Sequence, residues 1–343
     1  SKGFVTPKGI NASGQVAGYI VLNGGNKRAF MFDGTTMRDL GTLGGENSEA
    51  VAINASGQVA GSAQLANEAY RAFRYDATGM HYLGFLNTKE STATAINANG
   101  HVVGKSGHAF IHDGFEMTPA FDFSANVENS SYATAINDRG QIIGVAKRPP
   151  PNDNTLYPFI SEFLAGSLST VFLRTGGDSI EAVAINKDGQ IAANLMYTNN
   201  PLAGFYTLPS NPLQTIPTEW KSIALDINDA SQVLVQSWNA AGNSRGCVFQ
   251  LASNTTTDIG DLGGNQTVPA AFNQSGQTVG QSKNADGKWR AFAWTASQGM
   301  VDLNTRLRNT PSGLVLENAL AIAGNGSIVA LTDTGDLVLL TTA

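Results

Sequence analysis

The chain has 343 residues, of which 42% are apolar and 14% charged, with 38 glycines and a net charge of -6. A negative net charge without clustered Lys and Arg argues against nucleic acid and anionic membranes as partners. The sequence contains no apolar run of about 18 residues, so we expect no insertion into a membrane. Abundant glycine and scarce helix formers favour many short strands joined by turns, and therefore an all-β fold.

The chain has a single cysteine, Cys247, which excludes an intramolecular disulfide and a zinc site built from cysteines. It opens with Ser-Lys-Gly and lacks an initiator Met. We interpret this start as a processed or truncated N-terminus from which an export signal has been removed, and expect an extracellular or cell-surface location.

A repeated phrase, Ala-x-Ala-Ile-Asn-x-x-Gly-Gln-Val-x-Gly, dominates the sequence. Its asparagine is found at Asn11, Asn54, Asn97, Asn137, Asn186, Asn228 and Asn273, and Ala323 takes that place in an eighth copy. The spacings between these positions are 43, 43, 40, 49, 42, 45 and 50 residues. A period in the forties is typical of one four-stranded propeller blade.

Each repeat predicts four strands in chain order. The first is the Ala-rich segment that ends at the Asn-x-x-Gly turn, where Gly favours a left-handed backbone and Ser231 replaces it in the sixth copy. The second strand carries Gln-Val-x-Gly, the third begins with phrases such as Arg28-Ala29-Phe30, and the fourth ends in phrases such as Asp39-Leu40-Gly41. Small residues in the first strand place it at a crowded central channel.

These elements predict one domain, residues 1–343, folded as an eight-bladed β-propeller of antiparallel sheets. The expected blades are 4–44, 47–86, 91–121, 131–174, 179–216, 221–260, 266–304 and 316–343. The last range has room for only three strands. A segment before Ser1 supplies its fourth strand, or that strand is missing.

Two further positions recur in the repeats and predict packing. The third strand carries Phe30, Phe73, Phe110 and Phe292, with looser copies at Phe159 and Phe205, and we expect these rings to pack between blades. The second strand carries Gly18, Gly61, Gly104, Gly144 and Gly280. Glycine inside a strand marks a close approach of backbones, which we assign to contact between adjacent sheets.

The phrases Ile-Asn-x-x-Gly-Gln-Val-x-Gly and His-Ala-Phe or Arg-Ala-Phe, with Leu40-Gly41-Thr42-Leu43-Gly44-Gly45, resemble the bacterial HAF repeat family. The resemblance spans essentially the whole chain. It implies a secreted bacterial repeat protein, and it implies no shared enzymatic activity.

Side chains able to do chemistry are few. His81, His101, His108 and His112 are the four histidines. On one strand His108 and His112 are roughly 13 Å apart, too far for one metal ion, so we predict no metal and no cofactor. We expect Arg28 with Asp39, and Arg290 with Asp302, to form structural ties across a hairpin, because a catalytic site is not needed in every blade. Glu46, Glu49, Glu90 and Glu181 lie near the starts of first strands, and we interpret them as solvated loop acids.

The loops at one rim vary most in length, from 105–107 in the third blade to 146–156 in the fourth. Variable loops on a rigid scaffold are a common place for ligands. The predicted ligand-binding residues at this rim are Tyr19, Tyr70, Lys147, Arg148, Trp238 and Trp289. The alternative is that these aromatic rings pack beneath their own loops.

Our leading hypothesis is a monomeric, non-catalytic binding propeller for a carbohydrate or a protein. A polysaccharide-cleaving enzyme, glycosidase or lyase, is second, and requires convergent carboxyl groups at the channel mouth. A purely structural module of a larger surface protein is third.

Overall fold

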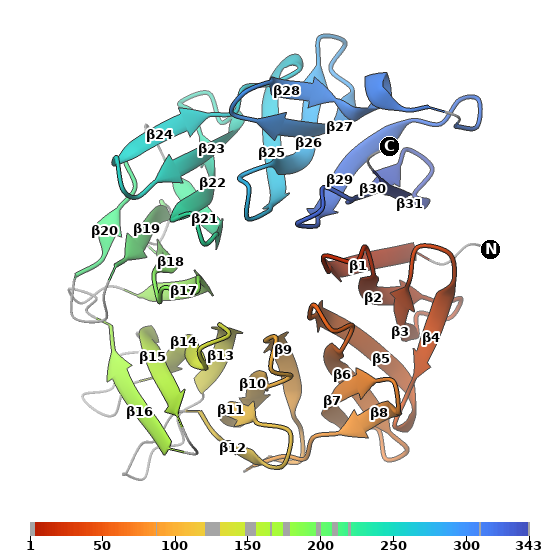
Figure 1. Ribbon diagram of the computed structural model, residues 1–343, viewed down its shortest axis with the longest axis vertical. Helices are drawn as coiled ribbons and strands as arrows, with labels where there is room; N and C mark the ends of the chain where they lie inside the picture. Colours follow the sequence, from red (N-terminus) through yellow and green to blue (C-terminus); the bar gives the residue numbers. More distant parts are fainter. Residues whose placement is uncertain are drawn as a thin grey trace.

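The computed structural model describes residues 4–86, 88–120, 131–147, 156–164, 167–173, 179–196, 200–207, 212–218, 221–308 and 310–341. Eight antiparallel sheets stand side by side in a ring, each with strands in sequence order from the inside outward (Figure 1). The all-β eight-bladed propeller predicted from the repeat is confirmed.

The first four blades consist of the following strands. Blade 1 holds β1 (Phe4–Ile10), β2 (Val16–Val21), β3 (Lys27–Phe32) and β4 (Met37–Gly41), and blade 2 holds β5 (Gly44–Ile53), β6 (Val59–Leu65), β7 (Tyr70–Asp76) and β8 (Gly79–Tyr82). Blade 3 holds β9 (Thr92–Ile96), β10 (Val102–Ser106), β11 (His108–His112) and β12 (Met117–Pro119), and blade 4 holds β13 (Ser131–Ile136), β14 (Gln141–Lys147), β15 (Leu156–Leu164) and β16 (Ser167–Phe172).

The other four blades follow the same plan. Blade 5 holds β17 (Ile180–Ile185), β18 (Ile191–Leu195), β19 (Leu202–Tyr206) and β20 (Gln214–Thr215), and blade 6 holds β21 (Ser222–Ile227), β22 (Gln232–Trp238), β23 (Ser244–Gln250) and β24 (Thr255–Asp258). Blade 7 holds β25 (Gly263–Phe272), β26 (Thr278–Asn284), β27 (Trp289–Thr295) and β28 (Gly299–Asp302), and is followed by a 3-10 helix, η1 (Leu303–Arg306). Blade 8 has three strands, β29 (Leu316–Ile322), β30 (Ile328–Thr332) and β31 (Leu337–Leu340).

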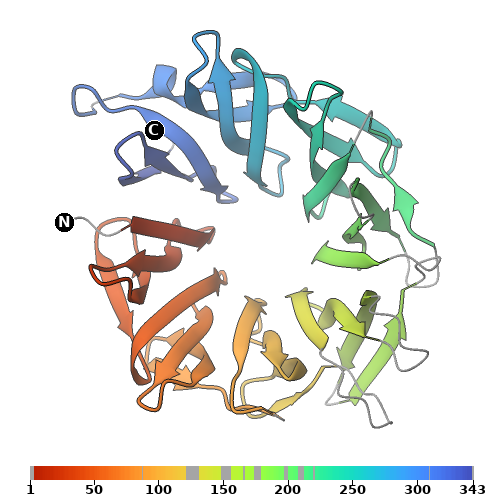
Figure 2. The same cartoon turned by 180° about the vertical axis from the view of Figure 1, so that it is seen from behind.

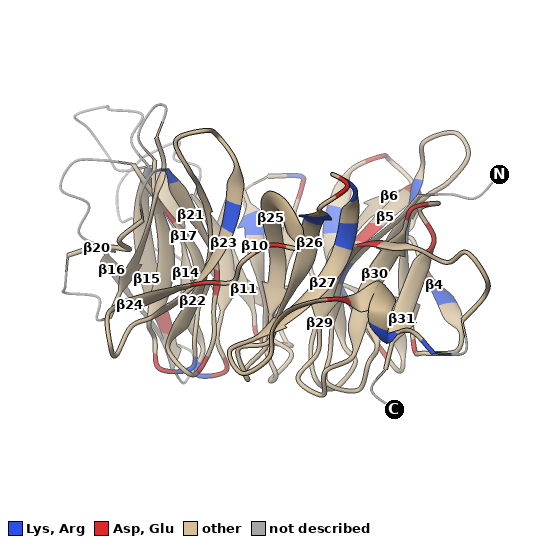
Figure 3. Cartoon of the chain, turned by 90° about the horizontal axis from the view of Figure 1, so that it is seen from above, with Lys and Arg blue, Asp and Glu red and all other residues tan. Residues whose placement is uncertain are grey.

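The innermost strands of all eight blades surround the middle of the ring, as the Ala-rich pattern predicted (Figures 1 and 2). Two of them, β5 and β25, begin at Gly44 and Gly263, earlier than the blade starts expected at residues 47 and 266. Seen edge-on, the ring carries few charged residues, and both signs are mixed (Figure 3). No described helix is long and apolar enough to cross a membrane.

The repeated asparagines connect each blade to the next. Asn54 Nδ2 donates to the backbone oxygen of Asn97, 3.0 Å away in the following blade. Equivalent bonds start from Asn11, Asn97, Asn137, Asn186, Asn228 and Asn273 and measure 2.9–3.2 Å. We call this series the asparagine ladder. It explains why the repeat keeps this residue in seven copies.

Asparagine suits this place because its amide also closes its own turn. Asn54 Oδ1 accepts from the backbone N–H groups of Ser56 and Gln58, and Nδ2 also donates to Gln58 Oε1 at 2.8 Å. The residue is buried, so each of these groups needs a partner. Aspartate would offer the acceptor without the donors. Gly57 closes the turn with φ +78, and Ser231 adopts φ 59 where it replaces glycine.

A hydroxyl at the start of the innermost strand forms a second link between blades. Ser48 Oγ accepts from Ala29 N–H at 2.9 Å and donates to the carbonyl of Gly41 at 2.6 Å, both in the preceding blade. Ser91, Ser131 and Ser222 accept from the equivalent amides at 2.9–3.1 Å. We call these contacts serine bridges.

Packing between blades is confirmed for all six predicted phenylalanine rings, although one of them, Phe205, packs on the following blade and not on the preceding one. Phe73, for example, is fully buried and packs on Ala17 and Ala29 of the preceding blade. Phe205 is also buried, but it faces blade 6 together with Val233 and Phe249. Gly204 pairs with Ala193 and so takes the phenylalanine register in blade 5. A shift of one residue moves a side chain to the other face of a sheet, so the looser phrase was aligned one place off.

The predicted role of the strand glycines is wrong in one respect. A Cβ on Gly61 would overlap the carbonyl oxygen of Glu49 and the ring of Phe73, and both belong to the same blade as Gly61. The close approach is therefore within one sheet rather than between sheets. Each innermost strand carries a bulge at this level, which brings its backbone over the glycine.

The junction between blades 8 and 1, called the 8–1 junction below, lacks both kinds of link. Ala323 has no amide to donate to Asn11, and Val5 stands where blades 2, 3, 4 and 6 have the bridging serine. Ser327 Oγ nevertheless lies 4.0 Å from the Cβ position of Gly14 in blade 1. At several other junctions the glutamine of one repeat lies near the turn glycine of the following blade in the same way. Val16, Phe30 and Val329 form the buried contact. Apolar packing therefore closes the ring here.

We predict that Ala323→Asn extends the asparagine ladder across the 8–1 junction. The new amide has the carbonyl of Asn11 as an acceptor, and one net hydrogen bond contributes about 1 kcal/mol. Thermal unfolding is expected to shift to higher temperature in Ala323→Asn and not in Ala323→Val. An unchanged or lowered midpoint in Ala323→Asn contradicts the extension.

Asp226 is the group through which we expect stability to depend on pH. It replaces the repeat's alanine two residues before Asn228, a position whose equivalents Ala184 and Ala271 pack toward the following blade. Burial raises the pKa of Asp226 to about 6, although Oδ1 accepts from Ile227 N–H at 2.8 Å. No described cation pairs with this carboxyl group.

We predict that stability falls as pH rises from about 4 to about 6, because the folded chain binds this proton more tightly than the unfolded chain, in which the aspartate has its ordinary pKa of 3.8. Asp226→Asn should raise the unfolding midpoint at pH 7 and flatten this part of the pH profile. The matched control is Asp286→Asn, which neutralises an exposed turn residue. If the slope of stability against pH seen in the wild type persists in Asp226→Asn, another titratable group causes it.

Candidate functional site

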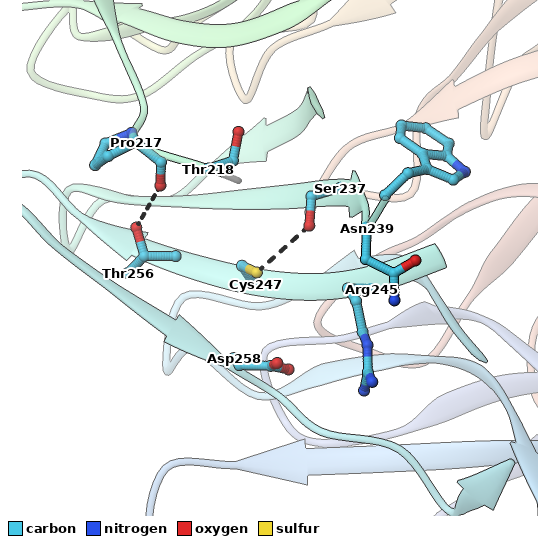
Figure 4. Close-up of a pocket in the computed structure, with 9 residues that line it drawn as sticks. Pro217, Thr218, Ser237, Asn239, Arg245, Cys247, Thr256 and Asp258 are labelled. Atoms are coloured by element: carbon cyan, nitrogen blue, oxygen red, sulfur yellow. Dashed lines mark hydrogen bonds between the residues drawn. The ribbon is translucent and has the colours of Figure 1, made fainter. Parts of the chain in front are cut away.

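An open groove of about 630 Å³ lies between blades 5 and 6 (Figure 4). Its walls come from strands β22, β23 and β24 of blade 6 and from the connection that leaves blade 5. The lining residues are Pro217, Thr218, Ser237, Trp238, Asn239, Arg245, Cys247, Thr256 and Asp258.

The groove exists because of one departure from the repeat. Cys247 pairs with Val235 and takes the register that phenylalanine holds in blades 1 to 4 and in blade 7. Blade 5 also lacks the ring, but there the side chain of Leu213 lies over Gly204, 3.0 Å from its Cβ position. The smaller cysteine leaves the 5–6 interface open at its level, while Phe249, two residues further along β23, packs on Phe205.

The strand register places polar groups along this face of blade 6. Arg245 and Cys247 lie two residues apart on β23, and their partners across the sheet are Ser237 and Asp258. Side chains two residues apart on a strand lie on the same face of the sheet, so all four of these side chains line the groove. Ser237 Oγ and Cys247 Sγ lie 3.8 Å apart, and both residues are only 8% exposed. Figure 4 shows these two side chains pointing toward each other.

The hydrogen-bonding groups of the groove are partly engaged. Arg245 Nη1 forms an ion pair with Asp261 Oδ2 at 2.8 Å, and both side chains are half-buried. Thr256 Oγ1 donates to the carbonyl of Pro217 at 3.3 Å, across the two blades. Asp258 is an exposed residue, and its Oδ1 accepts from Gly260 N–H at 2.7 Å. The groove therefore presents donors and acceptors of both neutral and charged kinds.

Trp238 is the one predicted ligand-binding residue that lines the groove. It is half-buried, and the Lys221 ammonium lies 4.9 Å from the centre of its ring. Tyr19 and Trp289 are half-buried in blades 1 and 7 beneath Lys27 and Lys283, at 4.7 and 5.1 Å. Each lysine belongs to the same blade as its ring.

The predicted residues are therefore not gathered into one site. Tyr70, in blade 2, lies near Lys27, whose hydrogen bond to Glu49 raises the pKa of the ammonium. Lys147 is the last residue of β14, and its side chain lies outside the described residues. Arg148 also lies outside them.

The expected structural ties are confirmed in blade 1 and wrong in blade 7. Arg28 Nη1 lies 3.7 Å from Asp39 Oδ2. Arg290 donates instead to the carbonyl of Trp289 at 2.7 Å, and Asp302 accepts from Asn304 at the start of η1. The carboxyl group is drawn away because η1 has no counterpart in blade 1, and its first turn needs an acceptor.

Four of the acidic residues and histidines considered for chemistry, Glu46, Glu49, His81 and His112, have local partners. Glu46 Oε2 accepts from Asn26 at 3.0 Å, and Glu49 Oε1 pairs with Lys27 Nζ at 2.7 Å. Burial lowers the pKa of His101 and of His112, so both are neutral at pH 7. His81 Nε2 lies 3.0 Å from Asp76. Within the described ranges, no three His, Cys, Asp or Glu side chains lie close enough to hold a metal ion.

Sequence reasoning missed most of the groove, and one signal was available. Cys247 breaks the phenylalanine position, but the phrase Arg-Gly-Cys-Val-Phe offers two residues for that register, and only the pairing with Val235 decides between them. The serine bridges were also missed. Ser48, Ser91, Ser131 and Ser222 each stand six residues before the repeated asparagine, a regularity visible in the sequence.

The sequence matches no protein-family model and no curated protein. Solved structures of similar fold include the β-propeller domain of the trilobed protease from Pyrococcus furiosus, described as having an open velcro topology. It has 14% identity and a TM-score of 0.56 over 91% of this chain and all of that one.

Two other similar structures are peptidases. A structure from a study of two prolyl endopeptidases has 11% identity and a TM-score of 0.60, covering 96% of this chain and 54% of its own. A puromycin-hydrolysing peptidase from Mycobacterium tuberculosis has 10% identity and a TM-score of 0.54, covering 98% and 57%. This chain thus spans a little over half the length of both. At these identities, all three comparisons show that the chain shares the propeller fold.

Proposed function

We propose that the chain is a non-catalytic binding propeller that holds a carbohydrate in the groove between blades 5 and 6. The observation that carries the proposal is the groove itself, about 630 Å³ in size, at the blade where Cys247 replaces the repeat's phenylalanine. Its size falls within the range of small-molecule sites. A secreted or surface-associated location is part of the proposal and rests on the resemblance to HAF repeats.

The chemistry of the lining favours a sugar. A sugar ring needs neutral hydrogen-bonding partners around its edge and an apolar surface against its C–H face. Ser237, Asn239 and Thr256 supply the first kind of group, and Trp238 supplies the second. The ion pair with Asp261 offsets the positive charge that Arg245 brings to the groove. The groove should therefore discriminate only weakly between ligands of different charge.

The lining favours binding over catalysis. Among the described lining residues, Asp258 carries the only carboxyl group, and that group is already bonded to Gly260. Glycoside cleavage by acid and base requires two carboxyl groups at a fixed separation across the scissile bond. Cys247 has no histidine beside it among the lining residues, so they supply no base for a nucleophilic thiol.

We predict that Trp238→Ala weakens glycan binding at least tenfold, because it removes the ring against which the sugar packs. Binding is measured by screening an immobilised glycan library and titrating the best ligand by calorimetry. Trp289→Ala is the matched control, since it removes a half-buried tryptophan beneath a lysine in another blade. Equal affinities of wild type and Trp238→Ala overturn the assignment, as does a library in which nothing binds.

We predict that Cys247→Phe abolishes binding while keeping the fold, because the ring restores the repeat and fills the groove. Apolar burial should raise the stability by about 1–2 kcal/mol, seen as a higher unfolding midpoint. Cys247→Ser keeps the groove open and should bind as the wild type does. A Cys247→Phe variant that is folded and still binds the glycan places the ligand elsewhere.

A further inference from the structure

An asparagine turn outside the ladder stands at the edge of the groove. Asn239 begins the turn Asn239-Ala240-Ala241-Gly242, and its Oδ1 accepts from the backbone N–H groups of Ala241 and Asn243, both at 3.0 Å. Gly242 closes the turn with φ 79, and its N–H donates to the carbonyl of Asn239 at 2.9 Å. The Asn-x-x-Gly turns of the asparagine ladder have the same geometry. The turn therefore holds the Asn239 side chain in one orientation.

The nitrogen of this side chain has no partner. In the asparagine ladder Nδ2 donates to a carbonyl of the following blade, as Asn54 does to Asn97. The turn at Asn239 lies at the opposite end of β22, and within the described part of the chain no group accepts from its Nδ2. Asn239 lines the groove. Its amide thus offers two N–H donors to a ligand, and its own turn already fixes their position.

Arg245 adds further donors on the same wall. Ser237 and Asn239 are two residues apart, and Ser237 pairs with Arg245 across the sheet, so these side chains share one face. Arg245 Nη1 is engaged with Asp261 at 2.8 Å, while its Nε and Nη2 have no partner among the described residues. Figure 4 shows the Asn239 amide and the Arg245 side chain at the same end of the groove. This end can bind an acceptor oxygen of a ligand.

An acceptor and a small apolar space lie next to these donors. Asp258 Oδ1 accepts from Gly260 N–H at 2.7 Å, and no described group donates to its Oδ2. Asp258 pairs with Cys247, which opens the space that a phenylalanine ring fills in blades 1 to 4 and in blade 7. The thiol and the ring of Pro217 border the groove, and both are weak hydrogen-bonding groups. A small apolar group of a ligand fits this place.

We propose that the groove recognises sugars that carry an acetamido group, the N-acetylhexosamines. This inference rests on the proposed function, because it names the class of sugar that the groove holds. The acetamido carbonyl accepts from Asn239 Nδ2, its N–H donates to Asp258 Oδ2, and its methyl group enters the space beside Cys247. A hydroxyl group on the same ring carbon is too short to make both hydrogen bonds and has no methyl group to bury.

The donors of the groove do not require an acidic ligand. Arg245 is the one cationic side chain among the described lining residues, and Asp261 already offsets its charge. Asp258 adds a negative charge on the same face. A neutral carbonyl oxygen uses the donors of Asn239 and Arg245 without bringing a further negative charge beside Asp258.

The test compares affinities for matched sugars. Methyl glycosides of N-acetylglucosamine, N-acetylgalactosamine and N-acetylmannosamine are titrated into the intact chain by calorimetry, each beside the parent hexose, which has a hydroxyl group at the same carbon. We expect at least one N-acetylated sugar to bind at least tenfold more tightly than its parent. Its N-formyl analogue, which lacks the methyl group, should bind about fourfold more weakly than the N-acetylated sugar.

Asn239→Asp identifies the donor that reads the acetamido group. Aspartate keeps the oxygen that accepts from Ala241 and Asn243, so the turn is retained, but it has no N–H to donate. The affinity for the N-acetylated sugar should fall at least fivefold, while the affinity for the parent hexose changes little. The matched control is Asn284→Asp in blade 7, where Oδ1 closes an equivalent turn away from the groove. It should leave both affinities unchanged.

The results that overturn this inference are separable from failure of the proposed function. If hexoses bind as tightly as their N-acetylated partners and Trp238→Ala weakens both, the groove holds a carbohydrate and the acetamido assignment is wrong. If Asn239→Asp weakens the two members of a pair equally, the amide does not read the acetamido group and the inference also fails. If no sugar of this panel binds, the inference is wrong, and the glycan library separately decides the proposed function.

Discussion

The structure depends on a hydrogen bond that links seven of the eight pairs of neighbouring blades. The carbonyl of the repeated asparagine accepts the amide of the preceding blade's asparagine, as Asn11 donates to Asn54 and Asn54 to Asn97. The same side chain closes its own turn, so one residue fixes both the hairpin and the docking of two sheets. Since the amide is buried, a blade displaced from the ring leaves a donor unsatisfied, at a cost of about 1–3 kcal/mol.

Where this interaction changes, the molecule acquires its distinctive features. At the 8–1 junction Ala323 ends the ladder, Val5 stands at the position of the bridging serine and blade 8 has three described strands, so the described contact there is the apolar cluster of Val16, Phe30 and Val329. Between blades 5 and 6 the ladder is intact, with Asn186 bonded to Asn228 at 3.1 Å. There the outer packing position changes instead, and Cys247 opens a groove. Both features are local departures from a repeat that holds the rest rigid.

The burial of Asp226 shows that such departures carry a cost. Six of the eight repeats have alanine two residues before the asparagine position, and these alanines fit the space between innermost strands without a polar group. Asp226 is half-buried at that position, and the partial loss of solvation raises the pKa of its carboxyl group to about 6. Asp226 thus distinguishes blade 6 from its neighbours, as Cys247 does.

The sequence by itself determined the number of blades, the strand order within each and the turn at each asparagine, because these follow from local chemistry that recurs at a fixed period. It also placed the alanine strands at the channel and the shortened blade at the end. Tertiary structure decided which face each side chain occupies. Phe205 and Cys247 show this, since a one-residue change of register reverses the face and only cross-strand pairing fixes the register. The groove and the burial of Asp226 each require two blades to meet, and no local pattern within one repeat contains that contact.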